Sequence, residues 1–306
     1  MTVTTGGPAR RAILAAGVLG GLGLIGTAGA LVYEDVLPGR VAALKWLGLT
    51  GPAGAVPAVP TGPSASGRFR SHRRGVDVNW AVSYPRGFED DARLPVCLVL
   101  HGRGASAAGM QEIGYPQVLS AAVAAGVPPF ALAAVDGGET YWHPRRDGDA
   151  QGMLLEEFLP LLARRGLQAS ENDRIGVLGW SMGGYGALLL AARLGSERVA
   201  GVVAESPALW LEPGDSAAGA FDDREDFERN DVFTRARLRA LTGVRVKIDC
   251  GRADPFWWAA RTYAQDLGKA TGTAPETDFG DGVHTNRYWL AKAPKSIGFI
   301  GNALVR

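Results

Sequence analysis

The chain has 306 residues, of which 46% are hydrophobic and 21% are charged, the composition of an ordinary folded domain. Its 32 basic and 31 acidic side chains leave a net charge of +1, so composition offers no positive field for a polyanion and we expect no nucleic acid partner. The two cysteines, Cys97 and Cys250, cannot form a CxxC metal cluster or a dense disulfide framework, although the four histidines leave room for a small catalytic site. We therefore expect no metal site.

The N-terminus has the pattern of an export signal. Arg10 and Arg11 precede an uncharged, mildly apolar run over residues 12–33. With the small residues at 28–30, this pattern predicts a twin-arginine signal at residues 1–33. The run also reaches the length of about 20 residues that spans a bilayer as a helix, so an uncleaved membrane anchor is the alternative. Either way, the rest of the chain is expected to be exported, and to be secreted or tethered to the outer face of the cytoplasmic membrane.

Residues 34–67 have the composition of a linker. They are rich in proline, alanine and glycine, with one apolar patch at residues 43–49 that allows a short helix. The remaining chain, residues 68–306, is long enough to bury one substantial core. We therefore expect a signal or anchor, a linker and a single catalytic domain.

The pattern of apolar runs in this domain predicts an α/β fold with a mostly parallel central sheet and helices on both faces. Alternation from Val76 to Val82 predicts a half-buried strand that pairs in a hairpin with the segment around Phe69. Short apolar runs then alternate with helix-length segments such as Met153–Arg165, as buried parallel strands do. These runs are 96–100, 130–135, 175–178, 199–204 and 244–248. In such sheets a site lies at the carboxyl ends of the strands.

A candidate nucleophile follows one of these strands. Gly179-Trp180-Ser181-Met182-Gly183 fits the GxSxG pattern, in which a sharp strand-to-helix turn lifts the serine hydroxyl above the sheet edge. Small residues on the following helix, which is expected to run to Leu194 before Gly195, allow it to pack close to the strand. The alternative is a glycine-rich turn with an incidental serine.

A serine hydroxyl needs a base, and His284 is the candidate that lies downstream of Ser181. It follows the nucleophile in the order nucleophile, acid, histidine, and it lies in a polar, glycine-rich turn. His72, His101 and His143 all precede Ser181, and we expect His101 to support a turn. A surface loop histidine is the alternative interpretation of His284.

The acid of a triad must lie between the nucleophile and the histidine, near a strand end, where it fixes the tautomer of the imidazole. Asp254 fits best, because it follows the strand at 244–248 and a turn, and precedes Pro255. Asp249 is the alternative, but its place inside the strand also suits a structural carboxylate.

Acyl transfer also needs donors for an oxyanion. The backbone N–H of Met182, directly after the nucleophile, is the first candidate. The turn after the strand at 96–100 offers a second, the N–H of Arg103. A flexible turn that only closes the strand is the alternative for Arg103.

These residues resemble a known family. Leu98-Val99-Leu100-His101-Gly102, the elbow around Ser181, Asp254-Pro255-Phe256, and His284 followed by Tyr288-Trp289 are together similar to the esterase family of α/β-hydrolases. That family includes esterase D, feruloyl esterases and the antigen 85 mycolyltransferases of actinobacteria. The resemblance implies an exported actinobacterial member with Ser181 as nucleophile, Asp254 as acid and His284 as base, with Arg103 and Met182 in the oxyanion hole. Antigen 85 proteins have a glutamate as the acid, so transfer of mycolyl groups is not implied.

The expected reaction is hydrolysis of a carboxylic ester through an acyl-enzyme, with no metal or organic cofactor. The substrate is expected to be a small-molecule or lipid ester. An aromatic loop after the strand at 130–135, and tryptophans after two later strands, are candidates for the walls of the pocket. They are Tyr141, Trp142, His143, Trp210 and Trp257. Core packing would explain the same residues.

Two other classes of function share these residues. An acyltransferase would pass the acyl group to a sugar or lipid alcohol, and a catalytically silent envelope protein would only bind. The charged stretch Asp215–Arg239 is expected to form an amphipathic surface helix or a small lid. Cys97 and Cys250 are expected to be two buried free thiols, with a disulfide as the alternative.

Overall fold

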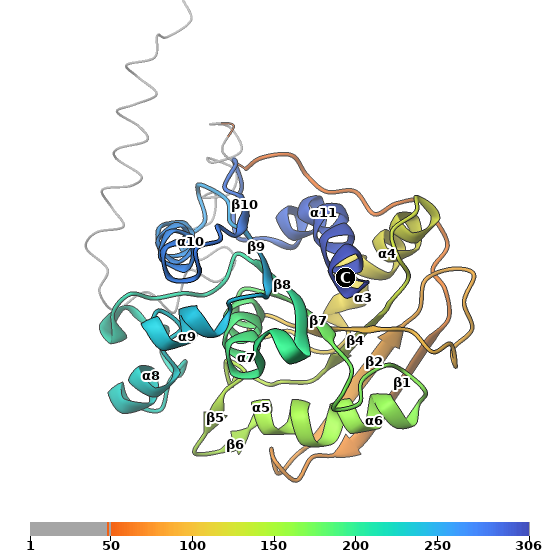
Figure 1. The fold of residues 1–306 in the computed structure, drawn as a ribbon, viewed down its shortest axis with the longest axis horizontal. Coiled ribbons are helices and arrows are strands. Elements are labelled where there is room, and N and C mark those ends of the chain that lie inside the picture. Colours follow the sequence, from red (N-terminus) through yellow and green to blue (C-terminus); the bar gives the residue numbers. More distant parts are fainter. Residues whose placement is uncertain (1–47, 49, 306) are drawn as a thin grey trace, which may run out of the picture.

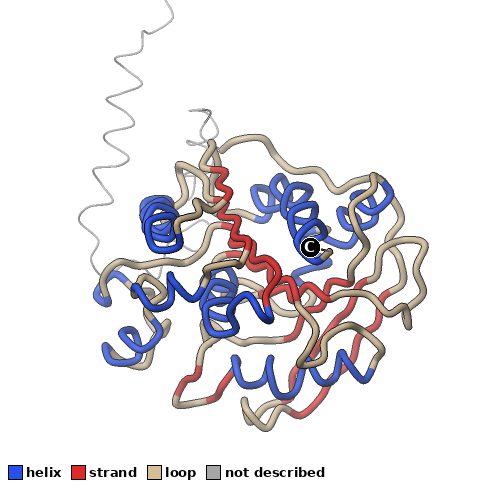
Figure 2. The backbone as a smooth tube through the Cα atoms, in the orientation of Figure 1, coloured by secondary structure: helices blue, strands red, loops and turns tan. Residues whose placement is uncertain are grey.

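In a computed structural model, which describes residue 48 and residues 50–305, an eight-stranded sheet forms the centre of the molecule (Figures 1 and 2). Its strand order is β1-β2-β4-β3-β7-β8-β9-β10; β2 pairs antiparallel with β1 and β4, and the other pairs are parallel. The strands are β1 (Ser64–Arg70), β2 (Asp77–Ser83), β3 (Val96–Leu100), β4 (Ala131–Val135), β7 (Ile175–Trp180), β8 (Val199–Glu205), β9 (Arg245–Asp249) and β10 (Glu276–Asp278).

Helices cover both faces of this sheet (Figure 1). On one face lie α3 (Gly109–Ile113), α4 (Tyr115–Ala124) and α11 (Asn286–Leu304). On the other lie α5 (Ala150–Met153), a π-helical turn (Leu154–Phe158), α6 (Leu159–Arg164), α7 (Met182–Arg198), α9 (Arg235–Ala240) and α10 (Trp257–Thr271). A short hairpin of β5 (Pro144–Arg145) and β6 (Gly148–Asp149), a 3-10 turn (Pro213–Asp215) and α8 (Arg224–Asn230) complete the fold. This architecture confirms the predicted fold class.

The core has one apolar layer on each side of the sheet. Every residue of β3, β4, β7 and β8 is buried. Successive residues point to opposite faces, so that Val177 of β7 joins the layer under α7 while Leu178 joins the layer under α11. Burying each such side chain stabilises the fold by roughly 1.5–3 kcal/mol. The central strands are therefore a rigid base for the loops at their carboxyl ends.

The predicted strands are present within one or two residues, and the hairpin around Phe69 pairs this residue with Val78. The helix that begins after Ser181 is interrupted at Gly195, where φ is 64°. Asp215–Arg239 does not form one amphipathic helix: it contains the short helices α8 and α9, separated by a turn. Strand β10 was not predicted.

The folded unit begins earlier than residue 68. Strand β1 starts at Ser64, inside the expected linker, and pairs with β2 along its length. Residues 50–63 also lie on the domain: the N–H of Gly54 donates to the carbonyl oxygen of Arg287 (3.0 Å), and the carbonyl oxygen of Pro63 accepts from the N–H of Tyr84 (3.0 Å). The expected signal or anchor lies outside the described residues. Among the helices of the described part, none is long and apolar enough to cross a membrane.

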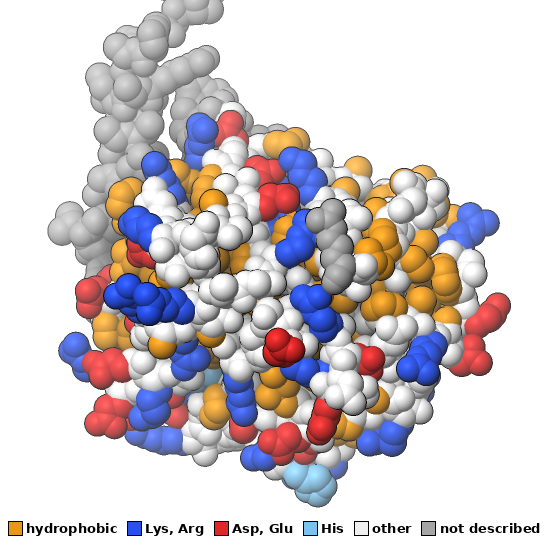
Figure 3. Space-filling model, in the orientation of Figure 1, with side chains coloured by type: hydrophobic (Ala, Val, Ile, Leu, Met, Phe, Trp, Pro, Cys, Tyr) orange, Lys and Arg blue, Asp and Glu red, His pale blue; other side chains and the backbone are white. Residues whose placement is uncertain are grey.

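The cysteines are free and buried, as predicted. Cys97 lies on β3 and Cys250 follows β9, and strands β7 and β8 separate them in the sheet. On the surface, the face drawn in Figure 3 carries basic and acidic side chains interspersed among apolar ones. That face presents no extended patch of one charge.

Candidate active site

Ser181 lies at a sharp turn between β7 and α7. Its backbone has φ 55° and ψ −120°, a region that L side chains rarely adopt and that costs roughly 1–3 kcal/mol. Glycine makes the turn possible, because a Cβ atom at Gly183 would overlap the carbonyl oxygen of Leu100 and one at Gly179 would overlap the carbonyl of Gly183. The strained turn therefore has the geometry of a nucleophile elbow.

Backbone hydrogen bonds hold the elbow in place. The N–H of Ser181 donates to the carbonyl oxygen of Glu205 on β8 (2.9 Å). Its carbonyl oxygen accepts from the N–H of Ala208 (2.9 Å) and from that of Tyr185 on α7 (3.1 Å). These hydrogen bonds thus hold Ser181 in its strained backbone conformation.

The structure brings together the three side chains predicted as a triad. Nε2 of His284 lies 2.9 Å from Oγ of Ser181, and Nδ1 lies 2.8 Å from Oδ2 of Asp254. When Nδ1–H donates to the carboxylate, Nε2 is free of its proton and accepts from the serine hydroxyl. This is the arrangement in which a serine can be activated as a nucleophile.

Asp254 reaches the histidine because two loops are joined. The N–H groups of Arg252 and Ala253 donate to the carbonyl oxygens of Gly280 (2.9 Å) and Gly282 (3.0 Å). Oδ1 of Asp254 accepts from the N–H of Phe256 (2.9 Å), which orients the carboxylate. We call residues 250–256, which carry Asp254, the acid loop, and residues 279–285, which carry His284, the histidine loop. These bonds hold the two loops together.

Two aromatic rings pack against the imidazole of His284. The ring centroids of Phe256 and Trp289 lie 5.4 and 5.1 Å from it, both in edge-to-face arrangements. Ser181, Asp254 and His284 are 0%, 5% and 8% exposed. Exclusion of water strengthens the polar contacts of the three groups. Phe256 was expected to add an aromatic wall beside the acid, whereas no role was predicted for Trp289, which belongs to a motif that carries the family resemblance.

His101 supports a turn, as expected. Its Nδ1 donates to the carbonyl oxygen of Gly102 (2.8 Å), and its Nε2 accepts from the N–H of Gly137 (2.9 Å). Burial lowers the pKa of His101, so the ring stays neutral and keeps both bonds. It braces the turns that follow β3 and β4.

Both predicted oxyanion donors belong to segments that adjoin Ser181. Met182 is the first residue of α7, where backbone N–H groups have no acceptor within the helix. The turn that contains Arg103 lies against the elbow, since a Cβ atom at Gly102 would be 3.4 Å from Cβ of Ser181. The side chain of Arg103 donates to Glu139 (2.8 Å) and to the carbonyl oxygen of Ala218 (3.2 Å), which fixes this turn.

The expectation that Trp142 and His143 line a pocket needs correction. Both side chains are fully buried, and they make contacts inside the protein. Trp142 donates Nε1–H to the carbonyl oxygen of His101 (3.2 Å) and packs against Gly186 of α7. His143 lies 3.1 Å from the carbonyl oxygen of Ala220 through Nε2. These contacts of both side chains are with the interior of the protein, which is the core packing given as the alternative interpretation.

The other predicted wall residues differ in how they relate to the histidine. Tyr141 is also buried, and its ring centroid lies 5.4 Å from that of Trp210. The ring centroid of Trp210 lies 5.7 Å from that of Phe256, and the ring of Phe256 packs against His284. Half-buried Trp210 is therefore one ring away from the imidazole of His284. Trp257 packs instead against Trp258 and the guanidinium of Arg261.

Glu205 is a buried acid near the site that was not predicted. Its carboxylate accepts from the hydroxyls of Tyr115 (2.5 Å) and Ser296 (2.6 Å). Burial raises the pKa of Glu205 to about 8, and the neighbouring Asp249 adds to this effect. The sequence feature that could have indicated Glu205 is an acidic residue at the end of an otherwise apolar strand.

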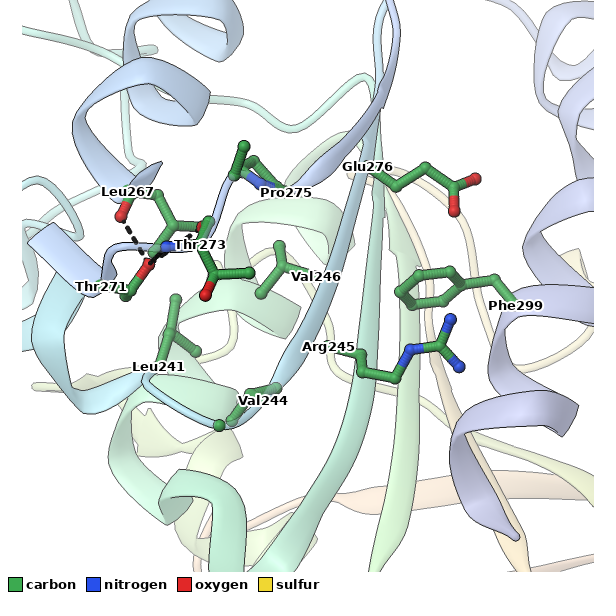
Figure 4. Close-up of a pocket in the computed structure, with 12 residues that line it drawn as sticks. Leu241, Val244, Arg245, Val246, Leu267, Thr271, Thr273, Pro275, Glu276 and Phe299 are labelled. Carbon is green, nitrogen blue, oxygen red and sulfur yellow. Dashed lines mark hydrogen bonds between the residues drawn. The ribbon is translucent and has the colours of Figure 1, made fainter. Parts of the chain in front are cut away.

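A groove of about 330 Å³ lies at the other end of the strands (Figure 4). It borders the first residues of β9 and the end of α10, and Arg245 lies under the ring of Phe299 there, 4.7 Å from its centroid. Ser181 and Asp254 follow the carboxyl ends of their strands, so this groove is not part of the site. Within the described residues, no cluster of histidine, cysteine or acidic side chains could hold a metal ion.

The fold and the arrangement of Ser181, Asp254 and His284 agree with the family that the sequence matches. The model of the Putative esterase family matches residues 71–293. The chain belongs to this family. By family it is a carboxylic ester hydrolase with the α/β-hydrolase fold.

Solved structures of similar fold come from several hydrolases. A ferulic acid esterase matches with a TM-score of 0.67 and 20% identity over 81% of this chain and 100% of its own. The fluorophosphonate-binding serine hydrolase F of Staphylococcus aureus matches with a TM-score of 0.64 and 17% identity, over 79% of this chain and 100% of its own. An S-formylglutathione hydrolase from Agrobacterium tumefaciens matches with a TM-score of 0.62 and 18% identity, over 79% of this chain and 95% of its own. None of the curated proteins matches this chain.

Proposed function

We propose that the protein cleaves carboxylic esters with Ser181 as nucleophile, His284 as general base and Asp254 as the acid that orients the base. The observation that carries this proposal is the position of the imidazole, 2.9 Å from Oγ of Ser181 and 2.8 Å from Oδ2 of Asp254. No other described histidine has a hydrogen bond to a serine hydroxyl and a carboxylate on its two ring nitrogens.

The reaction has two matching halves. His284 takes the hydroxyl proton of Ser181 as Oγ attacks the ester carbonyl, and Asp254 stabilises the imidazolium that forms. The N–H groups of Met182 and Arg103 hold the oxyanion, where one well-placed donor contributes about 3 kcal/mol. The imidazolium returns its proton to the leaving alcohol, which gives the acyl-enzyme. Water then repeats the same steps and releases the acid.

The acyl group is proposed to be apolar or aromatic, on a small-molecule or lipid ester. Half-buried Trp210 and Phe256 supply apolar surface next to His284. The match to a ferulic acid esterase supports an aromatic acid among the substrates to be tried. No metal or organic cofactor has a part in this chemistry.

Export of the catalytic domain is part of the proposal. It is supported by the paired arginines and the uncharged run over residues 12–33. Expression with a tagged C-terminus, cell fractionation and N-terminal sequencing test it. Retention of the tagged chain in the cytoplasm would contradict export, and an intact N-terminus in the membrane fraction would indicate an anchor.

The experiment that tests the function is labelling of the full chain with a fluorophosphonate, followed by peptide mapping, alongside turnover of p-nitrophenyl acetate and butyrate. We expect one label per molecule, on Ser181, and its loss with ester turnover in Ser181→Ala. A folded protein without label or turnover would instead support the silent binding protein. Ester consumed without matching free acid when trehalose or glycerol is added would support the acyltransferase.

A further inference from the structure

The segment that precedes the first strand, residues 50–63, runs along the outside of the domain from the histidine loop to β2 (Figure 1). We call it the N-terminal arm. It starts beside Asp281 and continues past the start of α11, where Gly54 donates to the carbonyl oxygen of Arg287 (3.0 Å). The side chain of Val56 then lies over Gly114. The arm therefore covers the histidine loop first and α11 next.

The contact between the arm and the histidine loop is backbone against backbone. A Cβ atom at Gly51 would overlap the carbonyl oxygen of Asp281 and lie 3.4 Å from the nitrogen of Gly282. Gly51 also has φ +66°, a conformation that glycine adopts without strain. A side chain at position 51 would therefore both overlap Asp281 and strain the backbone, so only glycine fits there.

The acid loop also packs against the same loop. A Cβ atom at Gly251 would overlap the carbonyl of Gly282, and the N–H of Ala253 donates to the carbonyl oxygen of Gly282 (3.0 Å). The histidine loop is therefore in contact with both the arm and the acid loop. Two residues after Asp281 comes Val283, and His284 follows it.

We propose that the N-terminal arm is a positioning element of the catalytic centre, and that Gly51 sets the distance between His284 and its partners Ser181 and Asp254. The contact at Asp281 adds a second packed segment to the loop that carries His284, so an added side chain at Gly51 has to displace either the arm or this loop. A displacement of about 1 Å in a catalytic group can lower the rate as much as 100-fold.

A matched pair of substitutions in the full chain tests this proposal. Gly51→Ala places a methyl group against Asp281. Gly48→Ala is the control, because Gly48 has a similar φ of +72° but, among the residues that the structure describes, no atom lies within 4 Å of the position that an added Cβ atom would take. Both changes add the same strain, and only the first displaces the histidine loop. Gly54→Ala, which would overlap Leu290 and Ala291, is a second test of the arm.

For Gly51→Ala we expect kcat for p-nitrophenyl butyrate to fall about 10- to 100-fold per fluorophosphonate-titrated site, with KM changed less than about twofold. Gly48→Ala is expected to match the wild type. Hydrogen exchange of the peptide around residues 280–284 should be faster in Gly51→Ala than in Gly48→Ala. Equal kcat and equal exchange in the two variants would overturn the proposal.

The proposal rests on the proposed ester hydrolysis, and the two can fail separately. If the wild type neither takes the label nor turns over ester, the proposed function is wrong, and the exchange measurement still tests the contact between the arm and the loop. If the wild type is active and Gly51→Ala is equally active, only the role of the arm is wrong. If Gly51→Ala does not fold, Gly54→Ala is measured in the same way.

Discussion

Nδ1 of His284 lies 2.8 Å from Oδ2 of Asp254, on a loop that has left the sheet after β9. Asp249, the last residue of β9, directs Oδ1 to Lys247 instead (2.9 Å). The two aspartates are close in the chain, but only Asp254 lies beyond the end of the strand, on the loop that reaches the histidine. The carboxylate of Asp249, inside the strand, therefore pairs with a lysine, whereas that of Asp254, beyond the strand, is placed to orient His284.

Asp254→Asn is therefore expected to lower kcat for p-nitrophenyl butyrate about 10⁴-fold, because an amide can stabilise neither the required tautomer nor the imidazolium. KM and the unfolding midpoint should change little, since the side chain keeps its shape. Asp249→Asn is the comparison: it weakens a buried ion pair, so stability should fall while kcat per labelled site is kept. A large loss of kcat in Asp249→Asn alone would reverse the assignment.

The close approach of α7 to the sheet predicts an effect on stability. A methyl group in Gly183→Ala would overlap the carbonyl oxygen of Leu100, so α7 has to shift. We expect a loss of roughly 1–3 kcal/mol in the free energy of unfolding, measured by urea titration, and slower labelling of Ser181. Gly214→Ala, where no atom of the described part of the chain lies within 4 Å of the added Cβ, should stay within about 0.5 kcal/mol of the wild type. Equal stability of the two variants would show that the elbow tolerates a side chain.

The features that were predicted correctly are those determined by short stretches of chain. Apolar runs specify buried strands because each residue of β3 or β7 faces a packed layer on one side or the other. The elbow around Ser181 is also local, since a strand, a glycine pair and a helix follow each other directly. The choice of Asp254 and His284 rests on the order nucleophile, acid, histidine of α/β-hydrolases, applied to the predicted strands and loops.

What could not be predicted depends on contacts between distant segments. Tyr141 and Trp142 both have positive φ, which turns their side chains inward, and no sequence pattern indicates that for aromatic residues. The glycines of the arm suggest flexibility in the sequence, yet Gly51 is packed against a loop far away in the chain. Strand β10 has only three polar residues, and it forms because β9 offers an edge to pair with.

Among the predicted wall residues, Trp210 packs on Phe256, which in turn packs on the imidazole of His284. We expect Trp210→Ala to raise KM several-fold for p-nitrophenyl butyrate and less for the acetate, because the longer acyl chain loses more apolar contact. Trp257→Ala is the matched control, since Trp257 packs on Trp258 and Arg261. Equal changes in KM for both esters, or a larger effect of Trp257→Ala, would contradict this placement of the acyl group.

The buried carboxyl of Glu205 predicts how stability depends on pH. Its pKa rises from 4.5 to about 8 in the folded protein, chiefly because burial disfavours the charged form. The folded state therefore holds a proton that the unfolded chain releases, so the stabilising effect is complete below about pH 4.5 and is lost as the pH rises through 8. Asp249, with a pKa raised from 3.8 to about 6 by burial, acts in the same direction at lower pH.

Glu205→Gln removes this titration while keeping a polar group between the hydroxyls of Tyr115 and Ser296. Guanidinium unfolding at several pH values from 6 to 8.5 should show stability falling with pH in the wild type, and a flatter dependence in Glu205→Gln. Burial also lowers the pKa values of His101 and His143, which makes stability rise with pH towards neutrality, so the difference between the two proteins is the quantity to compare. Glu212→Gln on the surface is the control and should keep the slope of the wild type. An identical slope in Glu205→Gln would mean that Glu205 is already ionised in the folded protein at neutral pH.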